Sequence, residues 1–192
     1  MFEIIRKSSK GGNYIVTTAV GKKYLDYWKI FALPLWEKYA QNYDLGIIVL
    51  DEEIDSKNSP TCKKINWQKL LILSELEMHF SFVKNVCLLD TDILINPFAP
   101  NIFESYKEDS IGLISKRKNM PYPFFDCMKR VSFYRNKFYS KEYPLDSGIF
   151  ISTEDLYIYH DLTPQEDYAC TGVIVLNVNN HAEFLKSIYY KY

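Results

Sequence analysis

The chain has 192 residues, of which 47% are hydrophobic and 24% charged, proportions typical of a soluble globular protein. This composition excludes a disordered or collagen-like chain, and the length fits one domain spanning residues 1–192. The formal net charge of −1 supplies no global field that would attract nucleic acid or an anionic membrane. Aromatic residues reach 16% of the chain, and core packing is the expected use of most of them.

The cysteines and the apolar runs exclude several kinds of site and location. Cys62, Cys87, Cys127 and Cys170 lie far apart without a CxxC pair, so structural zinc is not expected. No apolar run approaches the roughly 18 residues that a transmembrane segment requires. The N-terminal stretch is too short and too charged for an export signal, so we expect a cytoplasmic location.

Short apolar runs alternate with segments of helical period, which is the pattern of an α/β domain. The first strand is expected at residues 14–20 and the second at 46–50. Between them, Pro34 should kink or break a helix whose apolar residues recur at helical spacing. The apolar positions of this helix are Tyr24, Trp28, Phe31, Leu35 and Tyr39.

The second part of the chain continues the alternation of strands and helices. Asn66 is expected to cap a helix whose apolar face extends to Phe80. Asn180 and Glu183 suit a capping box at the start of the last helix. Strands are expected at residues 86–95, 111–115, 148–152 and 172–178.

Two carboxylates, Asp90 and Asp92, stand in the apolar strand expected at residues 86–95. Such a strand belongs at the centre of a sheet, whose carboxyl end is where open α/β sheets bind ligands. Residues i and i+2 of a strand point the same way, so both carboxylates would address one ion. Mg²⁺ or Mn²⁺ takes oxygen ligands and leaves positions for phosphate oxygens. An exposed turn that ends the strand, where Asp is common, is the alternative.

The segment INWQKLLILSELEMHFSFVKNVCLLDTDILINPFAPNIFE resembles nucleotide-diphospho-sugar transferases, which are glycosyltransferases of the GT-A fold similar to the glycogenin and galactosyltransferase-like families. Two further segments match in the same order, YIVTTAVGKKYLDY before it and TGVIVLNVNNHAEFL after it. The resemblance therefore extends over most of residues 14–185. Within the long segment, residues 65–104, the matching positions are Trp67, Lys69, Asp90, Asp92 and Pro97.

The resemblance implies an α/β fold with a single GT-A (Rossmann-like) domain, in which helices flank a central, mostly parallel mixed sheet. Its nucleotide-binding half would lie at about residues 12–97, and its acceptor and sugar half at about 98–192. The implied activity is metal-dependent transfer of a hexose-type sugar from a nucleotide-diphosphate donor, most often a UDP-sugar. The partner in this transfer would be a hydroxyl of a glycan or another acceptor.

The resemblance also implies the roles of particular residues. Asp90 and Asp92 would hold Mn²⁺ or Mg²⁺, which stabilises the charge of the leaving diphosphate. Tyr24 would stack on the base, or pack in the core. Asp51 would accept a hydrogen bond from the base or ribose, or be an ordinary turn residue. The nucleotide-sugar site would comprise Thr17, Thr18, Ala19, Tyr24, Asp51, Lys69, Leu89, Asp90, Thr91, Ser147, Gly148, Thr171 and Gly172.

Lys69 carries a separate argument from its place in the first turn of a predicted helix. The helix macrodipole disfavours a cation there. The position becomes favourable if Lys69 shares the helix terminus with a bound diphosphate or a carboxylate. A solvated Lys near Asp51 or Glu52 is the alternative.

Three carboxylates are candidates for the catalytic base, namely Asp146, Glu166 and Asp167. An inverting transferase needs a carboxylate that removes the proton of the acceptor, whereas a retaining one more often relies on the leaving diphosphate. The sequence does not choose among the three, and a solvated acidic loop is the alternative for each.

One feature departs from the family pattern. Many relatives supply a third metal ligand, usually His, from a C-terminal segment, and here the chain stops at Tyr192. His160 is a candidate ligand, whereas His79 and His181 are expected to be structural. A catalytically silent GT-A-like domain that binds a nucleotide sugar or glycan therefore stays open. A third hypothesis, a phosphoryl-transfer or nuclease metal site, would need further carboxylates, and none is evident.

Residues 116–141 are both basic and aromatic. Such a stretch suits single-stranded nucleic acid, which is bound by phosphate contacts and base stacking. It also suits an acceptor site in which aromatic rings cover sugar faces, or an amphipathic helix with a solvated basic face. Nucleic acid is the least favoured of the three, and we do not expect it as a partner.

Overall fold

The computed structural model describes residues 2–115, 118–119, 123, 125–126, 157–158, 161–165, 167 and 169–192. The chain forms two compact units, one made of Met1–Gly112 with Gly172–Tyr192 and the other of Leu113–Thr171. The strand expected at residues 148–152 and most of the basic stretch lie outside the described residues. Across the part that is described, no helix combines the length and apolarity needed to cross a membrane.

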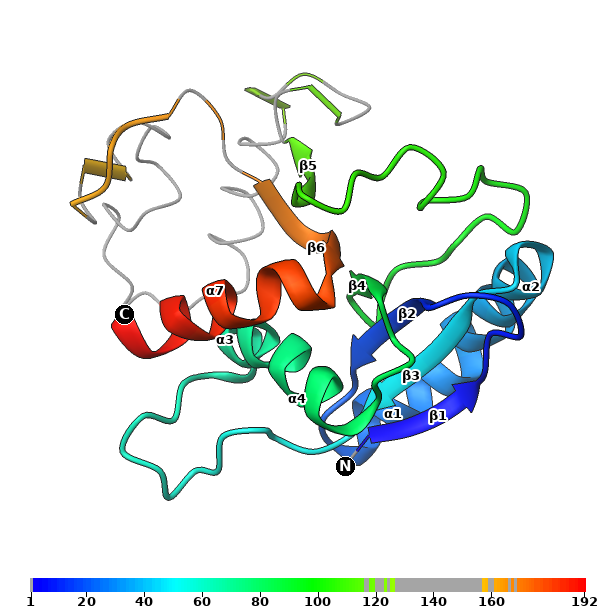
Figure 1. The fold of residues 1–192 in the computed structure, drawn as a ribbon, viewed down its shortest axis with the longest axis horizontal. Helices are drawn as coiled ribbons and strands as arrows, with labels where there is room; N and C mark the ends of the chain where they lie inside the picture. The colour runs from blue at the N-terminus through cyan, green and yellow to red at the C-terminus, as the bar shows by residue number, and fades with distance from the viewer. Residues whose placement is uncertain are drawn as a thin grey trace. The chain divides into compact units, whose positions relative to one another are not determined.

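The centre of the structure is a six-stranded sheet with the order β1-β3-β2-β4-β6-β5 (Figure 1). Strand β2 pairs in parallel with β3 and β4, whereas β1 is antiparallel to β3 and β6 is antiparallel to β4. This mixed sheet, flanked by helices, confirms the predicted α/β class. The strands are β1 (Phe2–Arg6), β2 (Asn13–Thr18), β3 (Gly46–Leu50), β4 (Asn85–Leu89), β5 (Gly112–Ser115) and β6 (Ala169–Asn177).

Different helices cover the two faces of the sheet (Figure 1). Tyr14 and Val16 of β2 belong to the core under α4 and α7, whereas Ile15 between them belongs to the core under η1 and α2. Neighbours along a strand point to opposite faces, so a strand covered on both sides is apolar throughout. All five residues of β3 are buried, and both of its predicted ends are confirmed. The helices are α1 (Lys22–Tyr27), η1 (Trp28–Ala32), α2 (Leu33–Tyr43), α3 (Ile65–Gln68), η2 (Lys69–Leu71), α4 (Ile72–His79) and α7 (Val178–Lys191).

The helix expected around Pro34 does not break there. Pro34 lies in the first turn of α2, where a missing backbone N–H removes no helical hydrogen bond. The irregularity comes just before it, in the π-helical segment η1. The wider hydrogen-bonded turn of a π-helix shifts the faces of the helices on either side.

This shift divides the single apolar stripe predicted for the helix. Trp28 and Tyr39 are buried, whereas Tyr24 and Phe31 are 62% and 64% exposed. The prediction is therefore wrong in placing all of them on one face. The pattern of apolar residues alone does not reveal a π-helical segment, because each half keeps an ordinary helical period.

Two predicted capping residues are also wrong. Lys64 occupies the N-cap position of α3 without a side-chain bond, so Asn66 lies inside the helix. The cap of α7 is Asn177, whose side chain accepts a hydrogen bond from the backbone N–H of Asn180 at 3.0 Å. A shift of two or three residues in a helix start is enough to transfer the capping role to another side chain.

Strands β2 and β4 are neighbours, and the connections from β2 to β3 and from β3 to β4 run on opposite faces of the sheet. After β2, the chain passes through α1, η1 and α2 on one face and returns as β3. After β3, it passes through α3, η2 and α4 on the other face and returns as β4 on the other side of β2. The crevice between the carboxyl ends of β2 and β4 is therefore a topological switch point, the position where open α/β sheets bind ligands.

Candidate functional site

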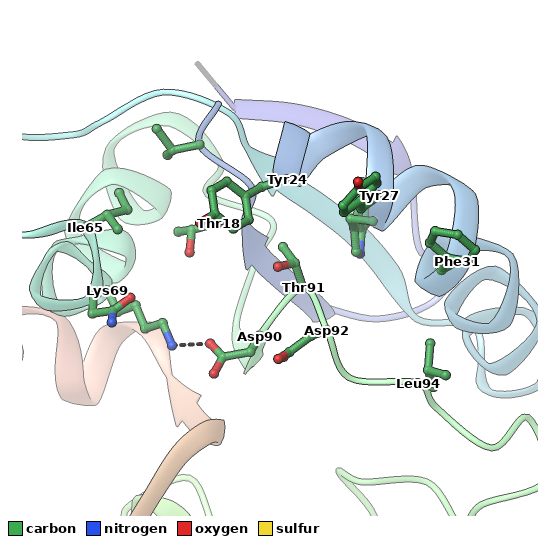
Figure 2. Close-up of a pocket in the computed structure, with 13 residues that line it drawn as sticks. Thr18, Tyr24, Tyr27, Phe31, Ile65, Lys69, Asp90, Thr91, Asp92 and Leu94 are labelled. Carbon is green, nitrogen blue, oxygen red and sulfur yellow. Dashed lines mark hydrogen bonds and ion pairs between the residues drawn. The ribbon is translucent and has the colours of Figure 1, made fainter. Parts of the chain in front are cut away.

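A cavity of about 720 Å³ opens at this switch point (Figure 2). Its lining comes from the end of β2, the α1–η1 helix, the α3–η2 segment and the loop that follows β4. The volume lies within the range of roughly 300–1,000 Å³ that is usual for small-molecule and cofactor sites. The fold therefore places a ligand-sized cavity where its topology predicts one.

One part of the cavity, here called the charged corner, consists of Lys69, Asp90 and Asp92. The ammonium of Lys69 forms an ion pair with Oδ1 of Asp90 (Figure 2). The Lys69 side chain is 13% exposed, while that of Asp90 is 41% exposed. Asp90 thus offers carboxylate oxygen to the cavity, while most of Lys69 is covered by protein.

Backbone hydrogen bonds hold Asp90 on both sides. Its N–H donates to the carbonyl of Gly172 in β6 at 3.0 Å. Its carbonyl accepts a hydrogen bond from the N–H of Ile93 at 3.1 Å, which closes the turn after β4. These two hydrogen bonds fix the backbone of Asp90 between β6 and the turn after β4, and so fix the point from which its carboxylate extends.

The two carboxylates lie in a turn and not in a strand. Strand β4 ends at Leu89, so the prediction that residues 86–95 form one strand is wrong beyond that residue. The argument that i and i+2 point the same way in a strand consequently does not apply to Asp90 and Asp92. Both line the cavity nonetheless, because the turn wraps around its edge.

Side chains of α2 hold the loop that follows the charged corner. The indole N–H of Trp36 donates to the carbonyl of Ile93 at 2.8 Å. Three more bonds anchor the next residues of the loop, so the strand-end turn is fixed from both sides. They run from Asn42 to Pro97 (2.9 Å), from Tyr43 to Ala99 (2.9 Å) and from Tyr39 to Pro100 (2.8 Å).

A second part of the cavity, here called the aromatic wall, consists of Tyr24, Tyr27 and Phe31. All three rings are more than half exposed, at 62%, 55% and 64%. Leu94, 61% exposed, also lines the cavity. Clustered exposed apolar side chains mark a binding surface more often than scattered ones do.

The charged corner is suited to a hard divalent cation. Carboxylate oxygens are the protein ligands that Mg²⁺ and Mn²⁺ prefer, and such ions are commonly held by one or two carboxylates together with substrate phosphates. Asp90 and Asp92 supply that pair. Among the described residues, no three His, Cys, Asp or Glu side chains are grouped closely enough to hold a metal by themselves.

Of the residues predicted for the nucleotide-sugar site, the structure gathers Thr18, Tyr24, Lys69, Asp90 and Thr91 around the cavity with Asp92. The others in this unit are not part of its lining. Thr17 is buried, and its hydroxyl donates to the carbonyl of Leu89 at 2.7 Å. The N–H of Ala19 donates to the carbonyl of Leu50 at 2.7 Å. Asp51 follows β3 and is not part of the lining.

The remaining predicted residues lie in the second unit or outside the described residues. In the second unit, Asp167 accepts a hydrogen bond from the hydroxyl of Ser115. Its backbone carbonyl accepts another from the hydroxyl of Tyr157 at 3.1 Å. Thr171 belongs to the same unit and is exposed. Asp146, Ser147, Gly148, His160 and Glu166 lie outside the described residues.

Two histidines have structural surroundings. Nδ1 of His181 accepts a hydrogen bond from the N–H of Asn177 at 3.0 Å, and His181 is buried. Nε2 of His79 lies 3.6 Å from a carboxylate oxygen of Glu75, one turn earlier on α4. Neither residue lines the cavity.

The predicted site residues did not include the cavity residues Val20, Tyr27, Trp28, Phe31, Ile65, Asn66 and Leu94. One signal was available, since Tyr24, Tyr27 and Phe31 follow each other at intervals of three and four and so share a helical face. For the other residues, only the folded loops bring the side chains to the cavity.

No protein-family model matches the sequence, and no curated protein matches it. Among solved structures, the chain is similar to a glycosyltransferase involved in the glycosylation of the major capsid of PBCV-1, with a TM-score of 0.51 and 13% sequence identity. The likeness covers 92% of this chain and 64% of that one, so this chain spans less than two thirds of that protein's length. The comparison shows that the fold is one that a glycosyltransferase has.

Proposed function

We propose that this protein is a metal-dependent glycosyltransferase that transfers a hexose-type sugar from a UDP-sugar to a hydroxyl of a glycan or another acceptor. The observation that carries this proposal is the cavity at the switch point, in which Lys69, Asp90 and Asp92 converge. The similarity in fold to a glycosyltransferase supports it.

The charged corner has the groups that a nucleoside diphosphate requires. Asp90 and Asp92 would hold Mn²⁺ or Mg²⁺, which when bound neutralises charge on the diphosphate as it leaves. The ammonium of Lys69 has three donors, so it can keep its bond to Asp90 and also donate to a phosphate oxygen. Lys69 is already positioned by its ion pair, so little side-chain entropy is lost when the diphosphate binds.

Tyr24 is the proposed platform for the base. In the view of Figure 2, Tyr24 lies toward Ile65 and Lys69, the side of the cavity that carries the ammonium group of Lys69. Its ring is 62% exposed, which leaves a face open for stacking. Thr18 and Asn66 add polar groups to the lining, which suits the edges of a base or ribose.

The transfer breaks the bond between the anomeric carbon and a diphosphate oxygen and forms a bond between that carbon and the acceptor oxygen. The acceptor proton goes to a carboxylate in an inverting reaction, or to the leaving diphosphate in a retaining one. Asp146, Glu166 and Asp167 remain the proposed candidates for that carboxylate. Ser147, Gly148, Thr171 and Gly172 remain proposed contacts of the sugar.

Calorimetric titration tests the proposal. UDP, GDP and their glucose, galactose and mannose conjugates are titrated with Mn²⁺, with Mg²⁺ and with a chelator. We expect metal-dependent binding in the wild type and its loss in Asp92→Ala. Asp26→Ala is the matched control, since Asp26 is an exposed carboxylate on α1 that does not line the cavity.

The outcomes separate the open hypotheses. Binding that ignores metal would contradict metal dependence and indicate either a domain that only recognises the nucleotide sugar or a metal-free transferase. If no nucleotide binds under any condition, the assignment of the charged corner to a donor fails. Equal loss of binding in Asp26→Ala would show a general effect of charge and not a metal site.

A further inference from the structure

The aromatic wall extends beyond the ring assigned to the base. In Figure 2, Tyr27 and Phe31 lie on the side of Leu94, away from Lys69 and Ile65. The rings of Tyr27 and Phe31 form an edge-to-face pair with centroids 6.2 Å apart. These two rings and Leu94, here called the distal end, are apolar side chains that line the same cavity as the carboxylates.

Trp28, the residue after Tyr27 in the chain, carries a buried hydrogen-bond donor. Trp28 also lines the cavity, and its side chain is only 1% exposed. Its indole N–H has no hydrogen-bond partner among the described residues. A buried donor without a partner is unfavourable, so a ligand that brings an acceptor atom to it is favoured. The donor also begins the π-helical segment η1, and such segments occur frequently at functional sites.

We propose that the distal end binds a sugar ring, which stacks on Phe31, contacts Tyr27 beside it and accepts a hydrogen bond from Trp28. A pyranose has an apolar C–H face for the rings and oxygen atoms for the indole N–H, and none of the described distal-end side chains is charged. The inference rests on the proposed function. A single nucleotide has one base, which is assigned to Tyr24 on the Lys69 side of the cavity, so the rings of the distal end are left for another part of the substrate.

Two sources supply such a ring, namely the sugar of the donor and a sugar of the acceptor. A donor sugar would make UDP-glucose bind more tightly than UDP, and this difference would depend on Phe31. An acceptor sugar would make methyl glucoside or methyl galactoside bind to the protein already saturated with UDP and Mn²⁺. Both sources use the same chemistry at the distal end.

The experiment combines calorimetry with NMR of the indole N–H groups. UDP, UDP-glucose, UDP-galactose, methyl glucoside and methyl galactoside are titrated into the wild type, Phe31→Ala and Ile30→Ala. Ile30 is the neighbouring control, because it is 62% exposed and does not line the cavity. The Nε1–H of Trp36, already bonded to Ile93, is the internal reference in the spectra.

We expect the Trp28 Nε1–H resonance to move on sugar binding while that of Trp36 stays in place. Phe31→Ala should weaken the sugar contribution about three- to tenfold and leave UDP affinity unchanged, and Ile30→Ala should change neither. If Phe31→Ala weakens UDP itself, the distal end holds the base and the inference is overturned. It is equally overturned if UDP binds but no sugar ring moves the Trp28 resonance. That result leaves the proposed donor site intact, whereas failure of UDP binding contradicts the proposed function.

Discussion

The charged corner and the aromatic wall face the same cavity but are held in place by different interactions. Polar bonds position Asp90, through the carbonyl of Gly172, the N–H of Ile93 and the ion pair with Lys69. The aromatic wall depends on the buried side of its own helix, where Trp28 packs edge-on against Trp36 with ring centroids 5.6 Å apart. Substituting an exposed ring should therefore change ligand binding without changing stability, because buried residues such as Trp28 and Trp36, and not the exposed rings, hold the helix in place.

The largest effect is expected at the residue that joins the two parts. Trp36 packs against Trp28 and donates a hydrogen bond to Ile93 in the loop after the carboxylates. Trp36→Ala should lower the free energy of unfolding by about 3–5 kcal/mol, since the side chain is fully buried. Urea denaturation measures this. Phe31→Ala, at the exposed side of the same helix, should stay within about 0.5 kcal/mol of wild type, and a large loss there would contradict the separation.

Lys69 should affect binding more than stability. Lys69→Met removes one charge-assisted donor to the diphosphate and should weaken UDP binding by about 1.5–3 kcal/mol. The unfolding free energy should change little, because the partner carboxylate of Asp90 stays 41% exposed to water. Calorimetry and denaturation of one preparation give both numbers. Lys64→Ala is the control, an exposed Lys in the same segment that does not line the cavity. A loss of stability without a loss of affinity would make Lys69 a structural residue.

Substitution of Tyr24 tests whether the exposed side of the helix binds the nucleotide base. Tyr24→Ala should weaken UDP binding by about 1–3 kcal/mol, whereas Tyr24→Phe, which keeps the ring, should bind nearly as wild type. Titration of both variants with UDP and with inorganic diphosphate separates stacking from phosphate contacts. Equal weakening for diphosphate would show that the ring does not stack on the base.

The smallest effect concerns a carboxylate far from the cavity. Backbone N–H donation from Ser9, with further bonds from Ser9, Lys10 and Ser8, holds the pKa of Asp44 below its ordinary value of 3.8. A lowered pKa in the folded state stabilises the protein above pH 3.8, and this contribution is lost as the pH falls through the folded value. Asp44→Asn should flatten the fall of Tm below about pH 4 and leave UDP binding at pH 7 unchanged. Melting curves from pH 2 to pH 5 check this, and an unchanged slope would contradict it.

The parts of the fold that follow from burial could be predicted from the sequence, and the parts that follow from chain geometry could not. Strand β3 is buried on both faces, and its uninterrupted apolar run gave both ends correctly. The apolar run of β4 did not show where the strand ends, because Ile93 and Ile95 continue it past the turn. The π-helical segment η1 left no mark in the apolar period.

The candidate site divides in the same way. Asp90, Asp92 and Lys69 could be singled out because charged groups at a strand end or helix start need a partner. Leu94 could not, since a lone exposed apolar residue carries no signal until folding brings it beside others. Thr17 shows the reverse case, because the resemblance implied nucleotide contact there, whereas Thr17 is buried and its hydroxyl donates to the carbonyl of Leu89.

The central claim is that a metal–nucleotide complex binds where β2 and β4 end, and paramagnetic broadening by Mn²⁺ tests it most directly. Amide signals of the labelled protein are followed as Mn²⁺ is added in the presence of UDP. We predict loss of intensity at Thr18, Lys69 and Thr91, which line the cavity. Gly12 and Lys84 directly precede β2 and β4, and the N–H of Lys84 donates to the carbonyl of Gly12. Their amide signals should keep their intensity, because they lie at the ends of these strands opposite to the cavity. Broadening that spares the cavity, or that does not depend on UDP, would contradict the account.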